Sequence, residues 1–139
     1  MNREKLLRQI ELHEGFRSKP YKDTVGKLTI GIGRNLDDVG ISRSEALFML
    51  EHDIRKCEQY LNRKDWYNSL DEMRQRVVID MCFNLGVNGF SKFKRTIKAI
   101  SDGRYDDAAS HMLDSKWARQ VGNRAKRLAK MMRTGEDYE

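Results

Sequence analysis

One stretch near the N-terminus, from Glu14 to Arg34, departs from the helical pattern of the rest of the chain. Residues Leu28 to Ile32 alternate between apolar and small or polar side chains, which is the period of a β-strand. Tyr21 to Asp23 forms a second short run, and Gly26 marks a turn between the two. The sequence therefore predicts a tight β-hairpin within a mainly helical chain.

A helix is predicted immediately before the hairpin, with Asn2 as its N-cap, apolar residues at helical spacing and Gly15 at its end. Glu14 lies in the last turn, four residues after Ile10 on the apolar face. Partial burial and the negative end of the helix dipole are both expected to favour its protonated form. A carboxyl group that keeps its proton is suited to general acid catalysis.

The hairpin supplies further reactive groups. Asp23 and Thr29 flank the same turn, so we expect them to lie close together. Gly31 and Gly33 carry no side chains, which leaves room for a ligand beside the backbone. A protonated Glu, an ionised Asp and a hydroxyl group are the groups needed to hydrolyse a glycosidic bond. Helix capping and turn formation are an alternative explanation for both carboxylates.

The same stretch resembles the catalytic signature of the phage-type lysozymes, the family of the T-even phage endolysins (glycoside hydrolase family 24). The signature E-G-x5-Y-x-D-x5-T-I-G-x-G is matched at Glu14, Gly15, Tyr21, Asp23, Thr29, Ile30, Gly31 and Gly33. Segments between Leu70 and Gly135 are similar, in order, to the helical lobe of those enzymes. The resemblance therefore covers nearly the whole chain.

The resemblance implies a mainly helical α+β fold of the lysozyme type, with two lobes in a single domain of residues 1–139. A small β-containing lobe with the active site is expected at about residues 14–41, and a connecting helix at about 43–61. A helical lobe, packed with the N-terminal helix, is expected at about 62–139. This length suits one domain.

The resemblance also implies a muramidase that hydrolyses the β-1,4 bond between N-acetylmuramic acid and N-acetylglucosamine in peptidoglycan. Glu14 would be the general acid, and Asp23 and Thr29 would position the attacking water. Substrate contacts are expected from Gly31, Phe83, Asn84 and Trp117.

Two of these residues have alternative interpretations. Asn84 could be a helix-capping amide instead of a hydrogen-bond partner in the cleft. Trp117 could stack against a sugar, but we prefer a core position with one exposed edge.

Two positions depart from the family pattern. Arg34 stands where the best-known members carry His, so the ion pair formed by that His is either replaced or absent. The segment between Arg34 and Ser42 is shorter than in the T-even phage enzyme, which suggests a trimmed small lobe with a more open cleft.

The remaining helices show clear start and stop signals. Ser42 and Glu45 form a capping box before a long amphipathic helix, and Gly86 is expected to end a largely apolar one. Asn123 is the expected N-cap of the last helix. On that helix Arg124 and Arg127 share a face, and we interpret them as a structural anchor that also suits wall contact.

Composition and charge limit the kinds of molecule that the chain is expected to bind. The formal charge is +6, and basic residues dominate from Lys92 to Arg133, which favours encounters with anionic polymers. No nucleic-acid-binding motif is present, so specific nucleic-acid binding is not expected. Cys57 and Cys82 are predicted to be buried free thiols. The histidines do not match zinc-ligand spacing, and we expect no metal or cofactor.

The N-terminus carries charges throughout and no apolar signal or transmembrane segment. We therefore expect synthesis in the host bacterial cytoplasm and action on the cell wall in the periplasm, after a holin has permeabilised the membrane. We expect a monomer. Two alternatives stay open at this stage. One is a lytic transglycosylase on the same fold, and the other is a non-catalytic basic module that binds the envelope or nucleic acid.

Overall fold

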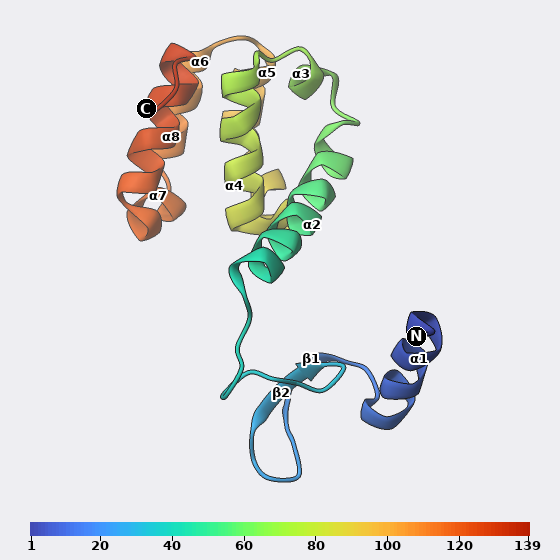
Figure 1. The fold of residues 1–139 in the computed structure, drawn as a ribbon. Helices are drawn as coiled ribbons and strands as arrows, with labels where there is room; N and C mark the ends of the chain where they lie inside the picture. Colours follow the sequence, from blue (N-terminus) through green and yellow to red (C-terminus); the bar gives the residue numbers. More distant parts are fainter. The chain divides into compact units, whose positions relative to one another are not determined.

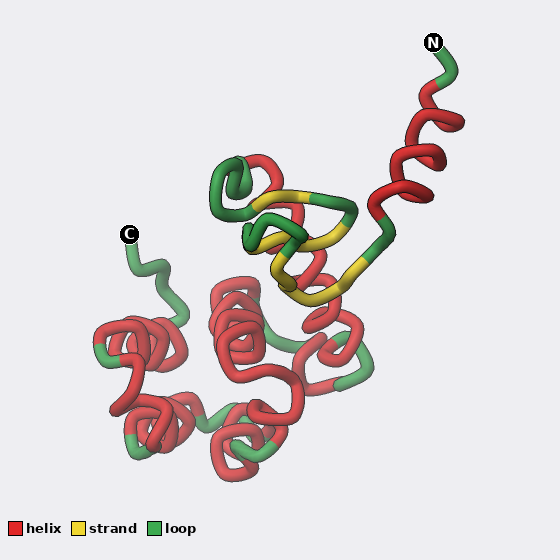
Figure 2. The backbone as a smooth tube through the Cα atoms, turned by 90° about the horizontal axis from the view of Figure 1, so that it is seen from below, coloured by secondary structure: helices red, strands yellow, loops and turns green.

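The computed structural model describes residues 1–139, which divide into two compact units, residues 1–49 and 50–139 (Figure 1). All strands lie in the first unit, and the second consists of helices joined by short loops (Figure 2). The predicted class, a mainly helical α+β fold, is confirmed. The packing of the N-terminal helix on the helical lobe stays a prediction.

The first unit opens with helix α1 (Arg3–Glu14). Asn2 is its N-cap, as predicted, and accepts a hydrogen bond from the backbone N of Lys5 at 3.0 Å. The helix ends at Gly15, whose φ of 72° is readily adopted only by glycine. Within the first unit no residue of α1 is buried, and Glu14 is exposed. The predicted partial burial of Glu14 depends on packing against the helical lobe and stays a prediction.

The sheet of the first unit has three antiparallel strands in the order β1 (Arg17–Lys22), β2 (Leu28–Gly31) and β3 (Arg34–Asn35). The predicted hairpin is confirmed as β1 and β2. Its first strand, however, begins at Arg17 and ends before Asp23, whereas we predicted Tyr21 to Asp23. The third strand was not predicted, because its two residues, Arg34 and Asn35, are both polar and too few to show an alternating pattern. Thr29 occupies the central strand, opposite Tyr21 on one side and Asn35 on the other.

Helix α2 (Arg43–Leu61) follows the predicted bounds of the connecting helix, and its residues from Leu50 onward belong to the second unit. The predicted capping box is confirmed. The Ser42 hydroxyl accepts a hydrogen bond from the Glu45 backbone N at 3.2 Å, and Glu45 Oε1 accepts one from the Ser42 backbone N at 2.9 Å.

The second unit contains helices α3 (Asp65–Asn68), α4 (Glu72–Ser91), α5 (Lys94–Ser101), α6 (Tyr105–Leu113), α7 (Lys116–Val121) and α8 (Asn123–Thr134). Helix α8 packs against α6 and α4, and α5 packs against α6. Large side chains that are fully buried fill the space between them, including Leu61, Met81, Phe90, Met112 and Met132.

Two helix boundaries in this unit differ from the predictions. Gly86 has non-helical angles (φ 78°, ψ 161°), but it interrupts α4 and does not end it, since helical structure resumes up to Ser91. Asn123 is the first residue of α8 and not its N-cap; Gly122 holds the cap position, where no side chain can cap the helix.

Cys57 and Cys82 are buried free thiols, as predicted. Burial, with a further contribution from the neighbouring Cys57, raises the pKa of Cys82 to about 12. None of the helices combines the length and the apolar character needed to cross a bilayer.

Candidate active site

The Glu14 carboxyl group lies beside the backbone of Gly33. A Cβ added to Gly33 would lie 2.5 Å from Glu14 Oε2 and 2.8 Å from Glu14 Cδ, so the carboxyl group occupies the space that a side chain would fill. Gly33 also has a φ of 72°, which favours glycine. The room predicted for a ligand at Gly33 is therefore taken by Glu14, and this expectation was wrong for that glycine.

The side chains of Asp23 and Thr29 both form hydrogen bonds with the backbone of one residue, Lys27. Asp23 Oδ1 accepts hydrogen bonds from the backbone N of Lys27 at 2.8 Å and of Val25 at 3.0 Å. Thr29 Oγ1 donates to the Lys27 carbonyl oxygen at 3.0 Å. The turn thus brings Asp23 and Thr29 close together, as predicted. Asp23 Oδ2 forms no hydrogen bond within the protein, and the Thr29 oxygen can still accept one.

These two groups differ in exposure. Asp23 is half-buried, whereas Thr29 is only 3% exposed because it lies in the central strand. The two strands next to it hold the Thr29 backbone in register. The residue that carries this hydroxyl group is therefore paired with a neighbouring strand on each side.

Gly31 lines a groove of about 690 Å³ in the first unit. Its φ is 69°, and a Cβ at this position would meet nothing within 4 Å, so the backbone there is open. Much of the groove wall is apolar, with Phe16, Ile32 and Phe48 exposed. Glu14, Asp23 and Thr29 do not line this groove.

Arg34 and Glu45 form the polar part of the groove wall. Arg34 donates to Glu45 Oε1 at 2.8 Å, contacts Glu45 Oε2 with its other terminal nitrogen, and donates to the Gly40 carbonyl oxygen at 3.1 Å. The ion pair of the family His is therefore replaced here by one between Arg34 and Glu45. The Arg34 hydrogen bond, followed by those from Ser42, lowers the pKa of Glu45 to about 2.

Asn84 is exposed near the break in α4, and its side chain is held by Trp117. Trp117 Nε1 donates to Asn84 Oδ1 at 2.7 Å. The indole ring is 4% exposed and packs edge-to-face against Phe93, with ring centroids 6.1 Å apart. The core interpretation of Trp117 is confirmed, and the ring has no free face for stacking on a sugar. Asn84 forms no capping hydrogen bond, and its amide nitrogen is free.

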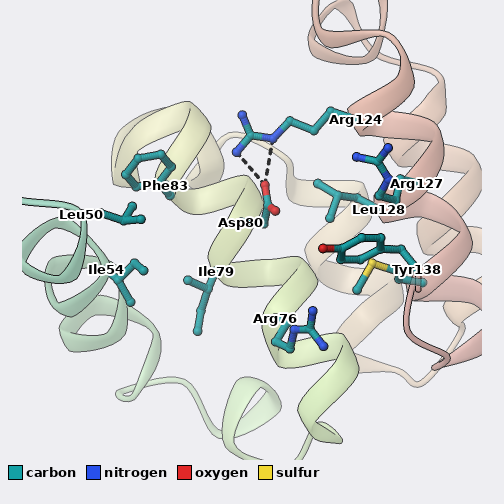
Figure 3. Close-up of a pocket in the computed structure, with 11 residues that line it drawn as sticks. Leu50, Ile54, Arg76, Ile79, Asp80, Phe83, Arg124, Arg127, Leu128 and Tyr138 are labelled. Carbon is teal, nitrogen blue, oxygen red and sulfur yellow. Dashed lines mark hydrogen bonds and ion pairs between the residues drawn. The ribbon is translucent and has the colours of Figure 1, made fainter. Parts of the chain in front are cut away.

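Phe83 lines a cavity of about 530 Å³ in the second unit, together with Leu50 and Ile54 of α2 (Figure 3). Phe83 is 40% exposed, so its ring is accessible from the cavity.

On the other side of this cavity, the Arg124 Nε and terminal nitrogen donate to Asp80 Oδ1 at 2.9 and 2.6 Å (Figure 3). Arg127 lies over the Tyr138 ring at 5.3 Å. The structural anchor predicted for the arginine pair is confirmed for Arg124.

Sequence reasoning missed the partners that position the site residues. Lys27 forms hydrogen bonds with both Asp23 and Thr29 through its backbone. Because its side chain takes no part in these bonds, the residue type could not predict this contact. Glu45 was recognised only as a capping residue, although its second oxygen is free to bind Arg34. Asp80 was not predicted as the partner of Arg124, because the two residues lie 44 positions apart on different helices.

Comparison with known proteins identifies the family of this chain. The sequence profile of the family described as phage lysozyme matches residues 11–134, and the chain belongs to that family. It is a glycoside hydrolase of the lysozyme type.

Several relatives are similar over most of this chain. A probable T4-type lysozyme of Dictyostelium discoideum is 29% identical, over 91% of this chain and 92% of the relative. The SAR-endolysin of Escherichia phage Mu is 26% identical, over 90% of this chain and 73% of the relative. The pre-baseplate central spike protein of Enterobacteria phage T4 is 27% identical over 88% of this chain, which corresponds to 26% of that protein.

Proposed function

We propose that this lysozyme hydrolyses the β-1,4 bond between N-acetylmuramic acid and N-acetylglucosamine in peptidoglycan. Glu14 is the general acid, Asp23 is the base that activates water, and Thr29 positions that water. The observation that carries the proposal is the placement of the two carboxyl groups relative to β2. Asp23 is bonded to Lys27, just before this strand, and Glu14 packs on Gly33, just after it.

The resemblance to the phage-type lysozymes favours a single displacement by water, with inversion at the anomeric carbon. Inverting glycosidases need a separation of about 6.5–9.5 Å between the carboxyl groups, which leaves room for a water molecule, and retaining enzymes only about 5–5.5 Å. Asp23 contacts Lys27, before β2, and Glu14 contacts Gly33, after it, an arrangement that suits the wider spacing.

In this mechanism the Glu14 proton passes to the glycosidic oxygen while the bond from that oxygen to the anomeric carbon breaks. Water attacks the anomeric carbon from the opposite face of the ring and gives a proton to Asp23 Oδ2, the oxygen that the turn leaves free. The Thr29 oxygen accepts a hydrogen bond from the same water, since its own proton is donated to Lys27. The products are two sugar chains, one with a hydrated reducing end.

Gly31, Asn84 and Phe83 are the proposed substrate contacts. The open backbone at Gly31 admits a sugar ring, and the free amide nitrogen of Asn84 can donate to a sugar or stem-peptide oxygen. Phe83 offers an exposed ring. Trp117 contributes indirectly, by holding Asn84.

The proposed biological role is that of an endolysin. The monomeric enzyme is made in the host cytoplasm and reaches the wall after a holin permeabilises the membrane. The similarity to the SAR-endolysin of phage Mu supports an endolysin function, and the route through a holin is proposed independently of it. Expression in a Gram-negative host tests it: cells should stay intact until chloroform or a holin is supplied, and lysis without either would contradict it.

The decisive experiment replaces Glu14 by Gln, which keeps the shape of the side chain and removes the titrating proton. Turnover of purified peptidoglycan should fall by about 10²–10⁴-fold while the thermal midpoint stays near that of the wild type. Glu11→Gln, one turn earlier on the same helix, is the matched control and should keep full activity. A folded Glu14→Gln variant with normal activity would defeat the assignment.

Mass spectrometry of the released fragments separates hydrolysis from the transglycosylase alternative. A hydrated reducing end is expected, whereas an anhydro sugar end would identify a transglycosylase. Salt-sensitive DNA binding without any lytic activity would favour the non-catalytic alternative.

A further inference from the structure

The first turn of α5 has backbone donors with no partner in the protein. Phe93, at the N-cap, provides no side-chain cap. The backbone N of Ile97 donates to the Phe93 carbonyl oxygen at 2.9 Å, which is the first hydrogen bond of the helix. The backbone N–H groups of Lys94, Arg95 and Thr96 are therefore free. Free N–H groups at a helix N-terminus, together with the helix dipole, bind anions.

Basic side chains surround this helix end. Lys92, Lys94, Arg95 and His111 line a cavity of about 350 Å³ at the start of α5. None of the ion pairs in the structure involves Lys92, Lys94 or Arg95. Asp114, at the end of α6, is the one carboxylate in the lining, so positive charge remains in excess.

A buried hydroxyl group opens into the same cavity. Thr96 is 2% exposed and lines the cavity, and its hydroxyl forms no hydrogen bond within the protein. Every fully enclosed side-chain oxygen in the structure has a hydrogen-bond partner. The small accessible surface of Thr96 therefore includes its hydroxyl. Ser115 also lines the cavity, but its hydroxyl group already forms hydrogen bonds within the protein. It donates to the Met112 carbonyl oxygen at 2.7 Å and accepts from the Ala118 backbone N at 3.0 Å.

We propose that this cavity is a phosphate-binding site. The terminal oxygens of a phosphate group can accept the three free N–H groups and the Thr96 hydroxyl at once, and Lys94 and Arg95 neutralise its charge. A carboxylate has fewer acceptor positions and half the charge, so it would leave donors unused. The ligand is either free phosphate or a phosphate ester of an envelope sugar. The site goes beyond the proposed muramidase activity and does not depend on it.

Titration of the ¹⁵N-labelled full-length protein with inorganic phosphate, at constant ionic strength, tests the site by NMR. The amide signals of Lys94, Arg95 and Thr96 should shift and saturate. Thr96→Val, which keeps the side-chain shape, and Arg95→Gln should each raise the Kd about tenfold, the loss of one charge-assisted hydrogen bond. Lys130→Gln, which removes an exposed charge on α8, is the control and should leave the Kd unchanged.

The same titration with N-acetylglucosamine 1-phosphate identifies the source of the phosphate. Tighter binding of this ester than of inorganic phosphate indicates an envelope sugar phosphate, and equal or weaker binding indicates free phosphate. An absence of saturable shifts overturns the proposal. So do shifts that acetate reproduces at the same concentration, or variants at Thr96 and Arg95 that both bind phosphate as the wild type does.

Discussion

The carboxyl group of Glu14 lies against the α-carbon of Gly33, at a place where any side chain would overlap it. The two residues belong to different elements, the last turn of α1 and the connection between β2 and β3. The space that the Glu14 carboxyl group occupies therefore explains why the signature has a glycine at position 33. Within the first unit, the contact with the Gly33 backbone is therefore a constraint on where the acid can lie.

Replacing Gly33 by Ala should displace Glu14 and abolish most activity. The new Cβ would lie 2.5 Å from Glu14 Oε2, and the positive φ of 72° adds strain of about 1–2 kcal/mol. Gly103→Ala is the matched control, because Gly103 has a φ of 73° and nothing within 4 Å of an added Cβ. Both variants should lose similar stability in thermal unfolding, but only Gly33→Ala should lose turnover. Normal turnover in Gly33→Ala would mean that Glu14 need not stay in place.

Replacing Asp23 by Asn should separate catalysis from turn formation. Asn keeps an oxygen that accepts from the backbone N of Val25 and Lys27, so the thermal midpoint should be equal to or higher than that of the wild type. Turnover should nevertheless be lost, because an amide cannot take a proton from water. Asp23→Ala should lose turnover and also about 1–2 kcal/mol of stability, since both turn hydrogen bonds disappear. An active Asp23→Asn variant would remove Asp23 from the mechanism.

The sequence predicted those features that depend on neighbours in the chain. The hairpin, the Asn2 cap and the capping box of Ser42 and Glu45 all result from interactions within a few residues, and each is confirmed. The proximity of Asp23 to Thr29 was predictable for the same reason. A predicted helix boundary was wrong at Gly86, because a glycine can either end a helix or only interrupt it. Here it interrupts α4, and the helix then resumes.

Features that depend on contacts between distant residues could not be predicted. The apolar stripe beside Glu14 predicts partial burial, but burial is set by what covers a helix and not by the stripe itself, so this stays a prediction. The Arg34–Glu45 pair joins residues eleven positions apart, and the Asn84–Trp117 hydrogen bond joins residues thirty-three apart. Only the fold brings such pairs together.

Replacing Trp117 by Phe should weaken catalysis through Asn84. The change keeps an aromatic ring in the core but removes the donor to Asn84 Oδ1, so the amide loses its fixed orientation. We expect a stability loss of about 1 kcal/mol or more and a rise in KM that exceeds the fall in kcat. Trp66→Phe is the control, since Trp66 packs edge-to-face on Tyr67 and has no such hydrogen bond. Equal effects of the two changes on KM would show that Trp117 acts only through packing.

The ion pair between Arg34 and Glu45 should make stability depend on pH in the acid range. Hydrogen bonds from Arg34 and Ser42 stabilise the charged carboxylate, which lowers the pKa of Glu45 from 4.5 to about 2 in the folded protein. The unfolded chain therefore binds a proton first as the pH falls. The stabilisation is fully present above about pH 4.5 and is lost as the pH falls towards 2.

Thermal unfolding of Glu45→Gln at a series of pH values checks this dependence. The variant should be less stable than the wild type near neutral pH, and the difference should shrink towards zero by about pH 2. The effect should be modest and weaker in high salt, because the Arg34 and Glu45 side chains are 37% and 41% exposed. Glu51→Gln, which breaks a more exposed pair with Arg55, should change stability little at any pH. A difference for Glu45→Gln that stays constant from neutral pH to pH 2 would show that Glu45 stabilises the fold as a neutral capping group and not through its charge.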